Sequence, residues 1–301
     1  MVVEINHTST KRLERKETLI GWLYVSPMVI GVLLFTLVPL VISIMAMFRE
    51  WDALENILQA PMVGMGNFKR IFGGVDTQLY WPAILNTIIF AVQLPICLIL
   101  GIFLALAMNR KMRGVQAFRV IYYLPGVMSM VAVAIVWKTI FNDDGIINTA
   151  FGKSVPWLSS VGGIYFTTNL LLVWKGVGYS TLMFIAGLQS VSTDQIEAAK
   201  IDGATDSKIF RAITLPALYP IIFYLFVTGL MGALQMFNEP FVLLGGYGTK
   251  NSGMTAVSFV YYAYDEMNNA GLASVGAWIL ALFIFIITAV QMIVDRKRRD
   301  A

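Results

Sequence analysis

Six long apolar segments follow one another along the chain and are separated by shorter polar stretches. A bilayer core takes roughly 20 apolar residues as a helix, and each segment meets or nearly meets that length with few or no charged residues. The segments cover residues 19–48, 81–108, 120–137, 169–191, 218–244 and 270–294. This pattern predicts an all-α integral membrane protein with six transmembrane helices. It divides the chain into an N-terminal tail (1–18), one helical domain (19–294) and a C-terminal tail (295–301).

The composition agrees with a membrane protein and excludes several classes of site. Hydrophobic residues make up 57% and charged residues 13% of the 301 residues, against about 45–50% and about 25% in soluble globular proteins. Cys97 is the one cysteine and His7 the one histidine, so neither a Cys/His zinc site nor an intrachain disulfide can form. Basic residues lie beside the apolar segments and form no continuous stripe, which favours a lipid bilayer over nucleic acid as partner.

The distribution of lysine and arginine predicts how the chain is oriented. Residues 1–18, 110–119 and 295–301 each hold four basic residues, and residues 194–211 hold three. The other three loops together hold six, and Lys175 lies inside an apolar segment. Because cytoplasmic loops carry an excess of lysine and arginine, both termini are expected in the cytoplasm.

A short polar island at residues 192–216 separates the fourth and fifth apolar segments. Ser192 with Gln195 fits a capping box at the start of a helix, and Gly203 permits a sharp turn after it. We therefore expect a short helix, a bend and a second helix led by Phe210 and Ile213. A hydrophilic segment with its own helix signals inside a membrane protein is suited to contact with a soluble partner.

No constellation for catalysis or nucleotide binding is present in the sequence. The run Gly152-Lys153-Ser154 resembles the end of a phosphate-binding loop, but the glycine required five positions earlier is Ile147. A Ser/His/Asp or Cys/His arrangement is excluded because His7 lies in a tail. The chain is thus predicted to be no enzyme and to bind no cofactor or metal, so any ATP hydrolysis would belong to another subunit.

Polar residues inside the apolar segments are candidates for a permeation pathway. Gln235, Asn238 and Glu239 lie close together in the fifth segment, and Pro240 is expected to break the helix locally. Permeation and helix packing both remain open for these residues, and Gln93 is a weaker second candidate. Lys175 is expected about two turns from the outer end of its helix, where its stem can extend to the interface.

The polar island resembles the EAA loop of permeases in ATP-binding cassette (ABC) importers. The resemblance rests on Glu-Ala-Ala at 197–199, Gly203 and the closing Leu215-Pro216. From about residue 85 to 294 the chain is similar to the maltose-type group of binding-protein-dependent sugar permeases. The further motifs are Ala186-Gly187-Leu188-Gln189-Ser190, Gln235-x-Phe237-Asn238, Gly245-Gly246 and Gly271-Leu272-Ala273-Ser274. Tyr247 stands where many relatives have proline, so the loop there is expected to differ.

The resemblance implies a six-helix type I permease domain and a set of partners. The partners are a second, similar permease, two ABC ATPase subunits that hold ATP and Mg²⁺, an extracytoplasmic solute-binding protein and a sugar or oligosaccharide substrate. The implied mechanism is alternating access, driven by ATP binding and hydrolysis and transmitted through the polar island. The coupling residues implied in this way are Glu197, Ala198, Ala199, Asp202, Gly203, Ala204, Phe210, Leu215 and Pro216.

Other functions compete with this interpretation. An ABC permease for another solute, such as an amino acid, phosphate or glycerol phosphate, is the nearest alternative. An ion-coupled secondary transporter could use Glu239 as its ion site and would need no ATPase, but the chain shows no internal repeat. A membrane enzyme is disfavoured because no catalytic constellation is present.

Overall fold

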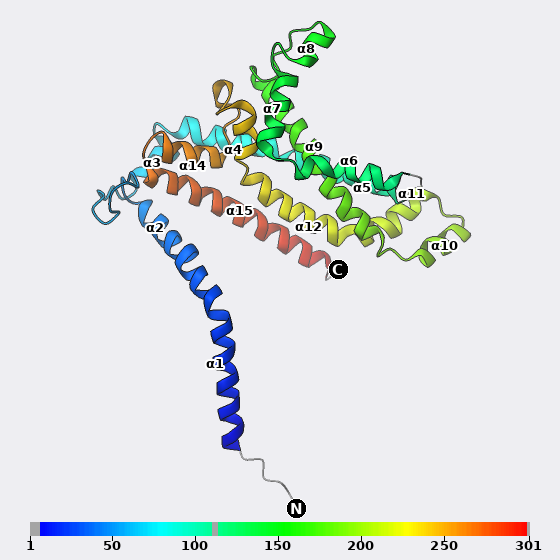
Figure 1. The fold of residues 1–301 in the computed structure, drawn as a ribbon, viewed down its shortest axis with the longest axis horizontal. Coiled ribbons are helices and arrows are strands. Elements are labelled where there is room, and N and C mark those ends of the chain that lie inside the picture. The colour runs from blue at the N-terminus through cyan, green and yellow to red at the C-terminus, as the bar shows by residue number, and fades with distance from the viewer. Residues whose placement is uncertain (1–6, 110–113, 300–301) are drawn as a thin grey trace, which may run out of the picture.

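The protein is a bundle of long helices in a computed structural model that describes residues 7–109 and 114–299 (Figure 1). The basic residues Arg110, Lys111 and Arg113, counted in the predicted loop, lie outside this range, as do residues 1–6 and 300–301. The elements are α1 (His7–Val32), η1 (Leu33–Leu37), α2 (Val38–Ala46), α3 (Gly66–Gly73), α4 (Thr77–Ala91), α5 (Gln93–Met108), α6 (Val115–Val127), α7 (Met130–Phe141), α8 (Ile146–Phe151), α9 (Val161–Leu188), α10 (Thr193–Ile201), α11 (Asp206–Ile209), η2 (Phe210–Thr214), α12 (Leu215–Leu234), α13 (Asn238–Leu244), η3 (Thr249–Asn251), α14 (Ala256–Asp265) and α15 (Ala270–Arg299).

The described residues contain five helices that are long and apolar enough to cross a membrane. They are Glu17–Ala46, Thr77–Met108, Val161–Leu188, Asp206–Leu234 and Ala270–Arg298. A sixth span results if the pair Ala117–Val127 and Met130–Phe151, bent by 98°, counts as one. Within residues 7–109 and 114–299, β structure is confined to one isolated bridge between Arg49 and Met62. The prediction of an all-α membrane protein is confirmed.

The third predicted span, residues 120–137, is not one continuous helix. α6 ends at Val127, Met128 is extended (φ −70°, ψ 144°), and α7 starts at Met130 in a new direction. Pro125 and Gly126 weaken the helix just before this break, because proline lacks an N–H group and glycine has low helix propensity. The Met128 carbonyl accepts a hydrogen bond from the Lys175 ammonium at 3.1 Å.

The fifth predicted span, residues 218–244, also breaks, but not at the expected residue. α12 ends at Leu234 and α13 begins at Asn238, so the break precedes Pro240. A proline ring clashes with the carbonyl group four residues earlier, here that of Met236, but is tolerated in the first turn of a helix. The Met236 carbonyl instead accepts a 2.6 Å hydrogen bond from the Thr255 hydroxyl. Gln235 and Glu239 therefore do not share one helix, although their spacing in the sequence implied that they would.

Several helices extend beyond the predicted segments. α1 begins at His7 and α15 continues to Arg299, so both run into the predicted tails 1–18 and 295–301. α9 begins at Val161, eight residues before the fourth predicted span. Lys175 consequently lies about four turns into its helix, and the expectation that it sits two turns from the end is wrong.

α5, α9 and α12 pack around a shared cluster of buried side chains. It includes Leu94, Leu98, Phe184, Leu218 and Leu225. Small residues let backbones approach closely, as is common between membrane helices. A Cβ atom added at Gly178 of α9 would lie 2.2 Å from the Tyr122 carbonyl oxygen of α6, and one at Gly187 would lie 2.3 Å from the Ile221 side chain of α12.

The first helical segment stands apart from the bundle. Figure 1 shows α1 projecting away from the other helices, and no residue in the most apolar part of Glu17–Ala46 is buried. Its end is fixed through α2, where the Trp278 indole of α15 donates a 3.0 Å hydrogen bond to the Ser43 hydroxyl.

Candidate functional site

The polar island forms a capped helix, α10, as predicted. The Ser192 hydroxyl accepts a hydrogen bond from the Gln195 N–H at 3.4 Å, which caps the start of α10. At its end, the N–H of Gly203 bonds to the Lys200 carbonyl and that of Ala204 to the Ala199 carbonyl, the pattern of a Schellman motif. Gly203 adopts the left-handed conformation (φ +77°) that this motif requires. Both the serine cap and the glycine turn were predicted from the sequence.

The second helix of the polar island is not a separate unit. Asp206 to Leu234 form one 29-residue helix that contains the π-helical turn η2. Pro216 explains that turn, because its ring conflicts with the carbonyl group of Ala212, and a wider turn avoids the clash. The N–H of Leu215 bonds to the Phe210 carbonyl, five residues back. Phe210, Leu215 and Pro216 thus belong to the first turns of a long apolar helix.

The surface of α10 is open to a partner. Glu197, Ala198, Asp202 and Gly203 are exposed, Ala199 and Ala204 are half-buried, and a Cβ atom at Gly203 would meet nothing within 4 Å. Asp194 in the first turn and Lys200 in the last complement the helix dipole.

Two isoleucines that sequence reasoning missed anchor and extend this surface. Ile196 packs against the core cluster of α5, α9 and α12, whereas Ile201 is 87% exposed at the end of α10. An apolar side chain at 201 in a polar segment was the available signal. α10 is therefore attached to the bundle by one face and presents the other.

A cavity of about 350 Å³ lies where the two broken spans meet. Its polar lining comes from Gln93 at the start of α5, Lys175 on α9 and Glu239 in the first turn of α13. The remaining lining residues are small or apolar: Gly126, Leu172, Gly176, Gly229, Gly232, Ala233 and Met236. Non-helical backbone at membrane depth is tolerated where it is buried in protein or lines a water-filled cavity.

The polar groups of this cavity have few partners inside the protein. Lys175 donates to the Met128 carbonyl, beyond the end of α6, where a cation is favoured by the helix dipole. The Gln93 amide oxygen accepts a 3.3 Å hydrogen bond from the Cys97 thiol. Among residues 7–109 and 114–299, the Glu239 carboxylate has no hydrogen bond or ion pair, and Lys175 and Glu239 are not paired.

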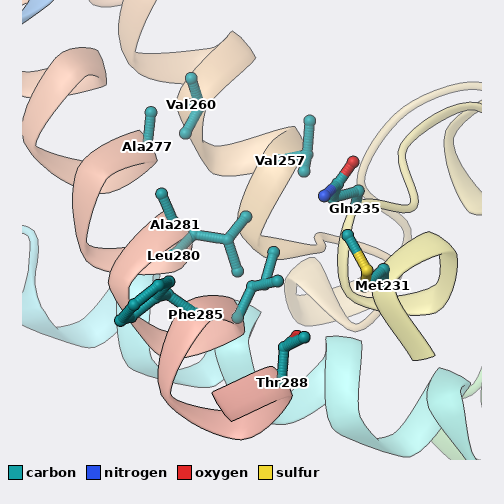
Figure 2. Close-up of a pocket in the computed structure, with 10 residues that line it drawn as sticks. Met231, Gln235, Val257, Val260, Ala277, Leu280, Ala281, Phe285 and Thr288 are labelled. Atoms are coloured by element: carbon teal, nitrogen blue, oxygen red, sulfur yellow. The ribbon is translucent and has the colours of Figure 1, made fainter. Parts of the chain in front are cut away.

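The predicted pathway residues do not form one group. Gln93 and Glu239 line the same cavity, but Gln235 lines a different one of about 450 Å³ between α12, α14 and α15. Figure 2 shows the Gln235 amide beside Met231 and Val257 at one side of this apolar pocket. Asn238 is exposed and lines neither cavity. The break at residues 235–237 separates these side chains.

Aromatic packing fixes α13 to α14 on the far side of the break. The Phe237 ring stacks on Phe241 at 5.0 Å and contacts Tyr261 of α14 at 5.2 Å between centroids. Phe241 also contacts Tyr247 edge to face at 5.5 Å. Burial is the main cause that raises the pKa of Tyr247, so its phenol stays neutral. Leu243 of α13 also packs in a buried cluster with α7 and α9, so α7, α9 and α14 together place Glu239.

Comparison with known proteins identifies the same family that the motifs indicate. The model of the family described as binding-protein-dependent transport system inner membrane component matches residues 97–300. The probable ABC transporter permease protein YesP of Bacillus subtilis is 32% identical, over 92% of this chain and 90% of its own. The lactose transport system permease protein LacF of Rhizobium radiobacter is 28% identical, over 97% and 99% of the two chains. The trehalose/maltose permease protein MalF of Thermococcus litoralis is 29% identical, over 98% and 100%.

A solved structure supports the fold. A chain of a bacterial ABC transporter involved in alginate import superposes with a TM-score of 0.82 at 23% identity, over 96% of this chain and 99% of its own. The prediction of an importer-type permease fold is confirmed. The family match spans more than half of the sequence, and one relative exceeds 30% identity over almost the whole length. The chain belongs to the binding-protein-dependent transport system inner membrane component family.

Proposed function

We propose that this chain is one of two permease subunits of an ATP-driven importer and translocates a sugar or oligosaccharide delivered by an extracytoplasmic binding protein. The observation that carries this proposal is the alignment, along nearly the full length, with permeases named for lactose and for trehalose and maltose transport. The family match disfavours an ion-coupled secondary transporter and a membrane enzyme. An ABC permease for another solute is the outcome that the experiment below must exclude.

The exposed face of α10 is proposed to dock into a separate ABC ATPase subunit. Its support is the exposure of Glu197, Asp202 and Ile201, together with the attachment of α10 through Ile196. ATP and Mg²⁺ are proposed to be held by that partner, because this chain lacks a complete phosphate-binding loop. Glu197 is assigned a polar contact there and no catalytic role.

The cavity lined by Gln93 and Glu239 is proposed as part of the substrate path, with Lys175 added to the predicted set. Asn238, exposed on α13, extends this path toward the second permease subunit. Gln235 is proposed to contribute only if the α12–α14–α15 pocket opens during transport.

The proposed orientation places α10 on the cytoplasmic side of a prokaryotic plasma membrane. Met108 at the end of α5 and Ile196 of α10 pack in one cluster, which supports a common side for the basic 110–119 loop and the polar island. Figure 1 shows the end of α5, the start of α6 and α10 at the same end of the bundle. Both termini are proposed to lie on the cytoplasmic side as well, because of the distribution of lysine and arginine.

Gene deletion with a solute screen tests this function. Cells that lack the gene should fail to take up one or a few labelled sugars or oligosaccharides, and the wild-type gene should restore that uptake. The restored complex should copurify an ABC ATPase. A deletion strain that loses uptake of an amino acid or a phosphate ester, with every sugar unaffected, would contradict the sugar assignment.

A further inference from the structure

Lys175 and Glu239 are two opposite charges that line one cavity without forming an ion pair. They come from α9 and α13, which share a buried cluster with α7 through Leu171 and Leu243. A charge in a membrane-spanning region is costly unless it is compensated. The charge of each side chain must therefore be compensated by the electric field of the other across the cavity and by the molecules that occupy the cavity.

The hydrogen-bonding capacity of the cavity is mostly unused. An ammonium group has three donors, and Lys175 directs one to the Met128 carbonyl. A carboxylate can accept at about four positions, and within the described part of the chain that of Glu239 has no donor. The Gln93 oxygen is engaged by Cys97, which leaves its amide N–H groups available. The cavity thus offers free donors and free acceptors with a formal charge of zero.

This combination fits an uncharged solute rich in hydroxyl groups. A hydroxyl group both donates and accepts, so neighbouring hydroxyls of one molecule can bond to Lys175 and to Glu239. A carboxylate or phosphate ester would be attracted by Lys175 but repelled by Glu239, and a cationic solute would meet the opposite conflict. The small residues Gly126, Gly176 and Gly232 leave room for such a molecule.

We propose that Lys175 and Glu239 form a charge filter that admits uncharged polyhydroxylated solutes and discriminates against acidic and basic ones. The proposal deepens the proposed function, on which it rests for the nature of the transported molecule. Lys175 and Glu239 are specificity-determining residues of this path. Neutralising one of them opens the path to solutes whose charge is opposite to the charge that remains.

The charge at the cavity can be measured without a known substrate. Gly232→Cys places a thiol in the lining, at a position where a Cβ atom meets nothing within 4 Å. The background is Cys97→Ser, which removes the native thiol and keeps a donor for Gln93. The full chain, co-expressed with its partner subunits in membranes, is treated with methanethiosulfonate reagents of similar size carrying negative, positive or no charge. The readout is the ratio of the anionic to the cationic reaction rate.

The expected result is a change of sign between two variants. Lys175→Met should lower the anionic-to-cationic ratio and Glu239→Gln should raise it, each by roughly threefold or more for loss of one nearby unit charge. The double variant should return near the parent ratio, and Lys175→Arg should preserve it. A matched control is Gly162→Cys, which lies about 20 Å from Lys175 along α9. At this position the ratio should respond to neither Lys175→Met nor Glu239→Gln.

Two results would overturn the proposal. Ratios that stay equal in all variants would show that the two charges do not control the cavity. A thiol that reacts with none of the three reagents in the Gly232→Cys protein would show that no water-filled cavity exists.

Uptake separates these outcomes from the proposed function. A uronic-acid analogue of the transported sugar should inhibit sugar uptake more strongly in Glu239→Gln cells than in wild-type cells. If no sugar is transported although the ratios shift as expected, the proposed function fails and the charge filter stands.

Discussion

The two ends of the helix from Asp206 to Leu234 show how differently prolines act in one membrane protein. Near the first end, Pro216 widens one turn into η2 and the helix continues. Beyond the other end, Pro240 is accompanied by a full break, and Thr255 of the neighbouring loop supplies the donor for the freed Met236 carbonyl. A proline therefore ends a helix where another element satisfies the exposed backbone.

This difference corresponds to two tasks. The continuous end follows α10, so we propose that a displacement of the polar island is transmitted along this helix. The broken end places Gly229, Gly232 and Ala233 in the cavity wall. In this way α12 connects the proposed docking surface to the proposed solute cavity, and the predictions below test its two ends.

The largest effect is expected at the docking end. Gly203→Asp should reduce uptake by about tenfold or more while the protein remains inserted, because the new side chain meets nothing of its own chain and would project toward the proposed ATPase partner. Aspartate tolerates a left-handed conformation better than most residues. The measurements are uptake and ATPase copurification. Gly64→Asp is the matched control, since Gly64 also has positive φ (+55°) and open space. Equal uptake and copurification in both variants would contradict the coupling role.

The next largest effect on uptake is expected for the polar residues near the break. Asn238→Leu is expected to impair uptake several-fold with normal assembly, because its exposed amide is proposed to face the path. Gln235→Leu should have a smaller effect, since Gln235 lines the separate apolar pocket. Transport rate and complex recovery are measured together. A loss of assembly that matches the loss of uptake would assign both residues to packing.

A moderate effect on stability is expected at the break itself. Thr255→Val removes the donor to the Met236 carbonyl and also the hydroxyl that caps α14 at the Ser258 N–H. It should lower the free energy of unfolding by about 1–3 kcal/mol, the cost of a buried unsatisfied group. Thermal inactivation in detergent reports this change. Thr228→Val serves as control, because the exposed Thr228 hydroxyl bonds only to Tyr224 of its own helix. Identical thermal behaviour of the two variants would show that the Met236 bond does not hold the break.

The smallest effect is expected at the π-helical turn η2, near the docking end of the same helix. Pro216→Ala restores an N–H group and allows a regular α-helical turn, so uptake should change by less than about twofold. Circular dichroism and uptake are the readouts. A tenfold loss would mean that the π-helical turn itself is required for transmission.

Much of the docking end could be predicted from the sequence, and much of the cavity could not. The Ser192 cap and the left-handed Gly203 depend on local residue chemistry, which a sequence displays directly. The position of the α12–α13 break depends on Thr255, a residue distant in the chain, and on aromatic contacts between α13 and α14. The depth of Lys175 in its helix was wrongly predicted because two glycines and two threonines interrupt the apolar run in residues 161–168, although this segment is helical.

Labelling of Ile201→Cys in the Cys97→Ser background tests the central claim most directly. In inside-out membrane vesicles stripped of the ATPase, the exposed thiol at the end of α10 should react with a membrane-impermeant maleimide, and rebinding of the ATPase should block that reaction. The same thiol should not react in intact cells. Labelling from the outside of cells, or labelling that the ATPase does not reduce, would contradict the account of α10 as the docking surface of this permease.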